Sequence, residues 1–189
     1  MIRRGRRRFQ RGQSVTEFAI AAPVLILLLL GAFDLTNLSN DLITAQEATR
    51  TGARVASILG GQTCVPAGSL LTELQVDDEI ASDVRAVASR IVYGTITAVY
   101  IYTPAATNGV FNAGTDKYAR YNATGARVSS SFSTTVPYDR NQIKDAETSV
   151  GVELDWTFRP PTGVGSPTLN FKEYSVFKAE TVLNPPPGC

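Results

Sequence analysis

The strongest constraint in this sequence is an apolar run of 16 residues, Phe18 to Phe33, bounded by the acids Glu17 and Asp34. As a helix at about 1.5 Å per residue, the run would be roughly 24 Å long, a little short of the ~30 Å hydrocarbon core of a bilayer. Apolar residues just outside the two acids extend it. A run of this kind can be a cleaved secretory signal, a buried core helix or a signal anchor that stays in the membrane.

A block of six arginines without any acid precedes the run, and the other 177 residues carry 12 basic and 17 acidic side chains. Such a block can bind nucleic acid. Its position beside an apolar run favours a topological role, because positive charge near a membrane segment decides which end stays in the cytoplasm. A buried helix would not need the block, and Leu30 fits poorly at the −3 position of a signal-peptidase cut after Ala32. We therefore expect a retained anchor with a cytoplasmic N-terminus and no nucleic-acid partner. The arginines are Arg3, Arg4, Arg6, Arg7, Arg8 and Arg11.

Helical periodicity continues beyond the apolar run. A stripe at 3-4 spacing predicts one helix from about Val15 to Leu59, roughly 65 Å long and ended by Gly60-Gly61. The stripe begins with large residues and continues with mostly small ones, so that a partner surface can approach closely. That partner is either the protein's own C-terminal domain or a neighbouring subunit, and one stripe can serve both. The stripe comprises Leu35, Leu38, Leu42, Ala45, Thr49, Gly52, Ala56 and Leu59.

The rest of the chain has the pattern of a small α+β domain. A second helix is expected from about Asp77 to Gly94, with acids in its first turn, where the helix dipole favours them. Period-two alternation predicts strands of an antiparallel sheet, with one covered and one solvent-facing side. Two stretches are rich in turn residues, 104–127 and 159–167, and the second is short enough to join two hairpin strands. The helix face is Ile80, Val84, Val87 and Ile91, and the strands are expected at 95–102, 128–136, 150–158 and 171–183.

The composition argues against most catalytic chemistry. The chain has no histidine, which removes Ser-His and Cys-His nucleophiles and the commonest metal ligand. It has no Gly-rich phosphate loop followed by lysine. The acids Glu153 and Asp155 fall on the expected solvent-facing side of a strand. We expect no enzymatic activity, no cofactor and no metal site, although catalysis by carboxylates alone stays open.

The only two cysteines are Cys64, after the predicted helix end, and Cys189, the last residue. If the domain lies outside the cytoplasm, these two can form a disulfide that ties the C-terminal tail to the helix end. In a reducing compartment they would be free thiols. The expected topology favours the disulfide.

The stretch RGQSVTEFAIAAPVLILLLLGAF resembles the start of TadE-like proteins, pilin-like components of tight-adherence (type IVb) pilus systems. The resemblance is carried by Arg11 to Ser14, by Glu17-Phe18-Ala19, by Pro23 and by the leucine-rich run, and it covers roughly residues 11–50. Beyond that segment only a general likeness is seen, in a strand-rich C-terminal domain.

The resemblance implies a prepilin processing site between Gly12 and Gln13, cut from the cytoplasmic side by a membrane aspartyl prepilin peptidase. Glu17 would then be the fifth residue of the mature chain and pair with the terminal amine of a neighbouring subunit. An acid near hydrocarbon is costly unless it is hydrated or paired, so the alternative is that Glu17 only reaches up to the headgroups. Pro23, also part of the family pattern, removes one backbone hydrogen bond and is tolerated in membrane or filament helices.

These features together predict a minor pilin or pseudopilin of α+β class with three parts. The parts are a basic leader (1–12), a long helix (13–61) embedded in the inner membrane to about residue 34, and an extracytoplasmic, pilin-like domain (62–189). The implied partners are the prepilin peptidase, other pilins or pseudopilins and the inner-membrane assembly platform. The main rival is a signal-anchored envelope protein whose outer domain binds a ligand; a secreted enzyme or toxin is a second rival.

Overall fold

The computed structural model describes residues 7–59, 73–132, 148–163 and 168–179 of the chain, and within these ranges it leaves out the side chains of residues 7–12, 59, 73 and 74. A long helix, α1 (Arg7–Leu59), is followed by a shorter one, α2 (Glu73–Ala88), and by five strands. The strands form one antiparallel sheet in the order β3-β2-β1-β4-β5, so the predicted α+β class is confirmed. The strands are β1 (Gly94–Thr103), β2 (Lys117–Asn122), β3 (Arg127–Ser130), β4 (Ser149–Phe158) and β5 (Leu169–Lys178).

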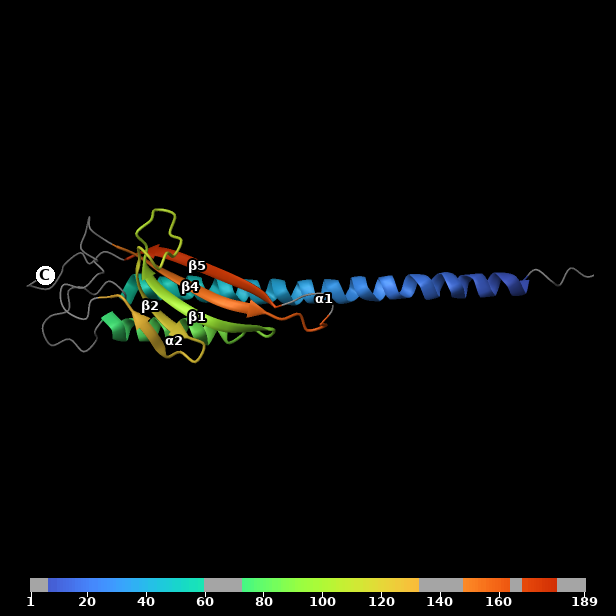
Figure 1. Ribbon diagram of the computed structural model, residues 1–189, viewed down its shortest axis with the longest axis horizontal. Coiled ribbons are helices and arrows are strands. Elements are labelled where there is room, and N and C mark those ends of the chain that lie inside the picture. Colours follow the sequence, from blue (N-terminus) through green and yellow to red (C-terminus); the bar gives the residue numbers. More distant parts are fainter. Residues whose placement is uncertain (1–6, 60–72, 133–147, 164–167, 180–189) are drawn as a thin grey trace, which may run out of the picture.

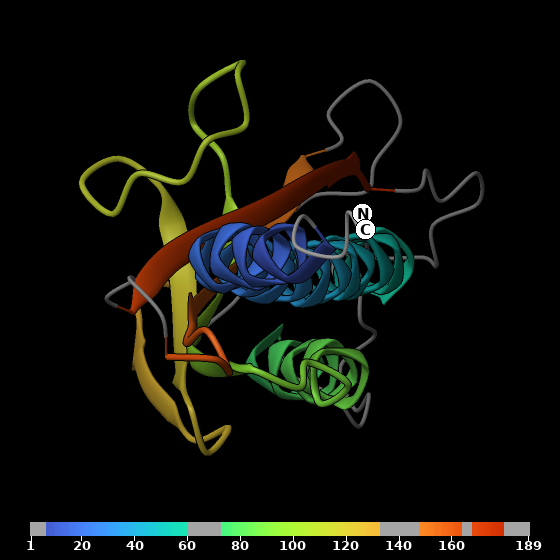
Figure 2. The same cartoon turned by 90° about the vertical axis from the view of Figure 1, so that its right-hand side faces the viewer.

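Both helices lie on the same face of the sheet. The C-terminal half of α1 packs against β4 and β5, and α2 lies beside α1 over β1 and β2 (Figure 2). The N-terminal half of α1 projects alone from one end of this domain (Figure 1). The molecule is therefore a rod with a compact domain built around one half of it.

The core lies between the helices and the sheet, as the alternating pattern of β4 requires. Val152, Leu154 and Trp156 point from β4 into this layer and are buried. The Trp156 ring stacks on Phe171 of β5, with the ring centroids 4.9 Å apart. The same layer holds Ile80 and Val84 of α2, together with the small residues of α1.

The stretch 104–127, predicted to be turn-rich throughout, contains strand β2. The sequence of β2 shows no clear alternation of apolar and polar residues, because its tyrosines lie on both faces of the sheet. Tyr121 is buried on the same face as Ala119, whereas Tyr118 lies among the aromatic rings of the opposite face. The predicted strand at 128–136 is shorter in the structure: β3 ends at Ser130, and Ser131 and Phe132 are not in a strand. Residues 133–136 lie outside the described residues. The join predicted between 150–158 and 171–183 is a hairpin of β4 and β5.

The second helix starts earlier than predicted, at Glu73, so Asp77, Asp78 and Glu79 follow its first turn and do not cap it. Asp78 instead accepts hydrogen bonds from the Tyr121 hydroxyl at 2.9 Å and from Arg127 Nη1 at 3.1 Å. It thus links α2 to β2 and β3, a role that spacing along the chain could not reveal.

Candidate membrane and assembly site

The projecting half of α1, defined here as residues 13–33, exposes its apolar side chains on every side. Phe18 is 69% exposed and Ile20 is 72% exposed, and no part of the most apolar window, whose mean hydropathy is 2.4, is buried in the protein. These 21 residues span about 31 Å, close to the ~30 Å hydrocarbon thickness. By length and composition the projecting half can cross a membrane once. An apolar surface on all sides has no partner in the described chain and needs lipid or neighbouring helices.

Glu17 lies near the start of the projecting half. Its Oε1 accepts a hydrogen bond from Gln13 Nε2, one turn earlier, at 3.1 Å, and both side chains are exposed. The backbone of Gly12 and Gln13 lies within α1, which begins at Arg7 and so includes the end of the basic leader. Helix geometry therefore brings the two predicted functional positions, the 12/13 bond and the acid, within about one and a half turns.

The other predicted positions on the N-terminal segment are only partly described. Pro23 lies inside α1, which continues through it as one helix. Arg7, Arg8 and Arg11 belong to the helical backbone, and their side chains are outside the described part. The structure does not describe the segment that contains Arg3, Arg4 and Arg6. It also does not describe the segments that contain Cys64 and Cys189, so the disulfide stays a prediction.

Asp34, the acid that closes the apolar run, contacts the domain. Its carboxylate accepts hydrogen bonds from the backbone N of Thr162, at 3.3 Å, and from the Thr162 hydroxyl. Thr162 belongs to the loop that follows β4. The acid that ends the apolar run therefore contacts the domain.

Asp41, two turns further along α1, is the stronger attachment. It is 2% exposed, and its two oxygens accept the backbone N–H groups of Val92 and Tyr93, each at 3.0 Å. These amides belong to the loop between α2 and β1. A buried carboxylate needs such donors, and charge-assisted bonds are stronger than neutral ones. The contacts of Asp34 and Asp41 with the domain were not predicted from the sequence. An acid next to an apolar stripe of a helix does indicate that the carboxylate can be buried with hydrogen-bond donors.

The C-terminal half of α1 packs through the small-residue stripe. Ala45, Thr49 and Ala56 are buried, and a Cβ on Gly52 would lie 2.1 Å from Val84 Cγ2 of α2. Leu35, at the start of the stripe, is exposed. Within the described residues, the stripe therefore packs on the protein's own domain from Leu38 to Ala56, and only its beginning is left for other partners.

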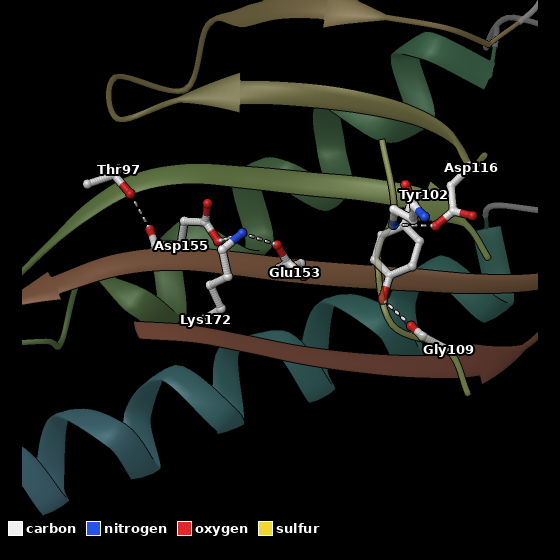
Figure 3. A network of polar contacts seen from close by, with 8 residues as sticks. Thr97, Tyr102, Gly109, Asp116, Glu153, Asp155 and Lys172 are labelled. Carbon is white, nitrogen blue, oxygen red and sulfur yellow. Dashed lines mark hydrogen bonds and ion pairs between the residues drawn. The ribbon is translucent and has the colours of Figure 1, made fainter. Parts of the chain in front are cut away.

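The opposite face of the sheet carries a polar network (Figure 3). Lys172 Nζ lies 3.0 Å from Glu153 Oε1 and 3.3 Å from Asp155 Oδ1. The expectation that Glu153 faces solvent is wrong, because it is 3% exposed under its neighbours. Burial raises the pKa of the Glu153 carboxyl, and the attraction of Lys172 only partly offsets it. The same carboxylates raise the pKa of the Lys172 ammonium, against the effect of burial.

The loop from 104 to 116 folds over one end of this face. Asp116 holds it by accepting the backbone N–H groups of Ala105, at 2.9 Å, and Asn112, at 2.8 Å, while the Tyr102 hydroxyl donates to the Gly109 carbonyl at 2.7 Å. Phe111 packs against the Tyr100 ring at a centroid distance of 4.7 Å. An open hollow of about 510 Å³ lies beside these rings and is bordered by Lys172. In the described part of the chain, no three Asp, Glu or Cys side chains gather as metal ligands would.

Comparison with known proteins agrees with the N-terminal geometry. Residues 12–54 match the family model described as TadE-like protein. No curated protein and no solved structure matches the chain significantly. The matched segment covers less than a quarter of the sequence, but it begins at Gly12 and contains the projecting half, Asp34 and Asp41. The predicted resemblance is confirmed for this segment: residues 12–54, most of the long helix, are similar to TadE-like proteins.

Proposed function

We propose that this protein is a minor pilin or pseudopilin of a tight-adherence pilus system, matured by a prepilin peptidase between Gly12 and Gln13. The observation that carries the proposal is the exposed apolar half of α1, with Glu17 near its start and the domain held on the other half. The six leading arginines hold the leader in the cytoplasm, and the domain lies outside. From the inner membrane the chain joins a filament or its assembly platform.

The chemistry of assembly follows from cleavage. Removing the leader creates an α-amino group on Gln13, one helical turn before Glu17. In a bundle of staggered helices, the amine of one subunit meets the carboxylate of the next, and each charge neutralises the other in a medium of low dielectric constant. Within one chain, the Gln13 side-chain amide donates a hydrogen bond to the Glu17 carboxylate. In the filament, the terminal amine of a neighbouring subunit replaces this donor.

Processing is tested by mass spectrometry of the chain expressed with its prepilin peptidase. The wild type is expected to begin at Gln13, and Gly12→Leu is expected to keep the arginine leader. Gly31→Leu is the matched control, because a Cβ there meets nothing within 4 Å. Normal cleavage of Gly12→Leu, or a native chain that keeps all six arginines, would contradict the proposal.

Pairing is tested by Glu17→Ala and by the isosteric Glu17→Gln. Both variants are expected to be processed normally but to give severalfold less pilus, because neither side chain can neutralise an amine. Glu47→Gln, an exposed acid further along α1, is the control and should assemble normally. Unchanged pilus output in the Glu17 variants would mean that this carboxylate only reaches the headgroups.

The hollow beside Tyr100 and Phe111 supports a second candidate, a signal-anchored envelope protein whose outer domain binds a ligand. Aromatic walls with a few polar groups are typical of ligand sites. An intact N-terminus that is unaffected by deleting the peptidase would favour this candidate over the pilin.

A further inference from the structure

Two loops lie side by side at the end of the sheet from which the projecting half of α1 emerges. One is the α2–β1 loop and the other is the loop after β4, and the backbone N of Arg159 donates to the Tyr93 carbonyl at 3.0 Å. Figure 1 shows the loop after β4 beside α1 at this end of the domain. We call the exposed side chains of the two loops the basal surface: Arg90, Val92, Arg159 and Pro161.

The two acids of α1 fix the height of the basal surface above the apolar run. Asp34 binds Thr162, so the second loop lies level with the end of the run. Asp41 binds the Val92 amide seven residues later, about 10 Å further along the helix. Each headgroup layer of a bilayer is roughly 5–8 Å thick. A modest helix tilt, or the length of an arginine side chain, brings the whole basal surface to the headgroups.

The chemistry of the basal surface fits an anionic interface. Arg90 and Arg159 are exposed, and neither forms an ion pair with a residue that the structure describes. Val92, in the same loop as Arg90, is 72% exposed. The acids at this level, Asp34 and Asp41, already accept hydrogen bonds from the domain. Two arginines beside an exposed valine and proline offer charge to phosphates and apolar contact to the upper acyl region.

We propose that the basal surface docks the domain on the headgroups of anionic phospholipids, in the leaflet from which α1 emerges. The domain then stands in one orientation about the α1 axis, with α2 and the sheet edge at fixed positions above the membrane. The inference rests on the membrane anchorage of the proposed function, and it adds a second, electrostatic contact with the same bilayer.

The test uses the full-length chain in vesicles of phosphatidylcholine with about one third phosphatidylglycerol. A photoreactive benzoylphenylalanine replaces Val92 in one sample and Val110 in the other. Val110 is also exposed but lies in the 104–116 loop at the opposite end of the sheet. Lipid adducts, detected by mass spectrometry, are expected at position 92 and not at 110, and fewer in vesicles of phosphatidylcholine alone.

Charge reversal then separates lipid docking from mere proximity. Arg90→Glu and Arg159→Glu are each expected to lower the adduct yield at position 92 by about fivefold or more. Arg54→Glu, an exposed arginine about 30 Å beyond Asp34 on α1, should leave the yield unchanged. Equal yields at positions 92 and 110, yields indifferent to charge reversal, or adducts to a second copy of the chain would overturn the proposal. Retention after alkaline carbonate extraction reports α1 insertion separately, so failed docking is distinguishable from failed anchorage.

Discussion

The two halves of α1 belong to one unbroken helix, yet their surfaces are built in opposite ways. The projecting half carries large side chains in all directions and buries none of them. The packed half, from Leu38 to Ser57, carries alanines, a glycine and a threonine along one stripe, and these are buried against α2 and the sheet. Asp34 lies between the two halves; it ends the apolar run and accepts hydrogen bonds from Thr162 of the domain.

The two halves differ in how their apolar residues are arranged around the helix. This arrangement, more than the number of apolar residues, distinguishes a helix surface that contacts lipid or other subunits from one that packs in the protein's own core. A striped helix has one partner direction, whereas an all-round apolar helix has none and is satisfied only by lipid or by several neighbours. Substitutions in the packed half should therefore change the stability of the domain. Equivalent substitutions in the projecting half should leave it unchanged.

The largest expected effect is that of Asp41→Ala. The change removes a buried carboxylate and leaves the amides of Val92 and Tyr93 without an acceptor, at a cost of about 3 kcal/mol. Urea unfolding in detergent micelles, followed by the fluorescence of the single tryptophan, Trp156, would measure the loss. Asn40→Ala, at the exposed neighbouring position, is the control and should change the free energy of unfolding by less than about 0.5 kcal/mol.

The next effect contrasts two glycines of the same helix. Gly52→Ala would place a Cβ 2.1 Å from Val84 Cγ2 and force α1 and α2 apart, so we expect a loss of about 2 kcal/mol. At Gly31, where a Cβ meets nothing within 4 Å, alanine should be neutral or slightly stabilising, because it favours the helix. If the two variants unfold alike, the close packing at Gly52 is not what holds the domain on the helix.

These positions also show how far sequence reasoning reaches. The small-residue stripe and the β4–β5 hairpin follow from local pattern, and they were predicted. The acceptor roles of Asp34 and Asp41 were not, because their donors lie 51 to 128 residues away. The burial of Glu153 was missed for the same reason, since alternation places a side chain on a face but does not say what covers that face.

A smaller effect is expected at the boundary between the halves. Asp34→Ala removes the acceptor of the Thr162 N–H and hydroxyl, but Asp34 is only half-buried, so the loss should be about 1 kcal/mol. Hydrogen exchange should rise in residues 159–163 while the core strands stay protected. Glu17→Ala, an acid of the projecting half, should change neither measurement. Faster exchange throughout the sheet in Asp34→Ala would mean that this contact supports the whole domain.

The smallest effect has the opposite sign and lies where the packed half meets β5. Burial raises the pKa of the Glu173 carboxyl, and a hydrogen bond with Gln46 of α1 only partly offsets it. Because the pKa is higher in the folded state, the native protein favours the protonated acid, and the wild type loses stability as the pH rises from the unfolded pKa through the folded one. Glu173→Gln keeps an uncharged side chain of the same shape at every pH, so it should be more stable than the wild type by a few tenths of a kcal/mol at pH 7. The advantage should disappear below pH ~4, where both proteins are neutral at this position. Glu47→Gln, an exposed acid on the same helix, should show no such pH-dependent difference, and an equal gain there would assign the effect to net charge instead of to the interface.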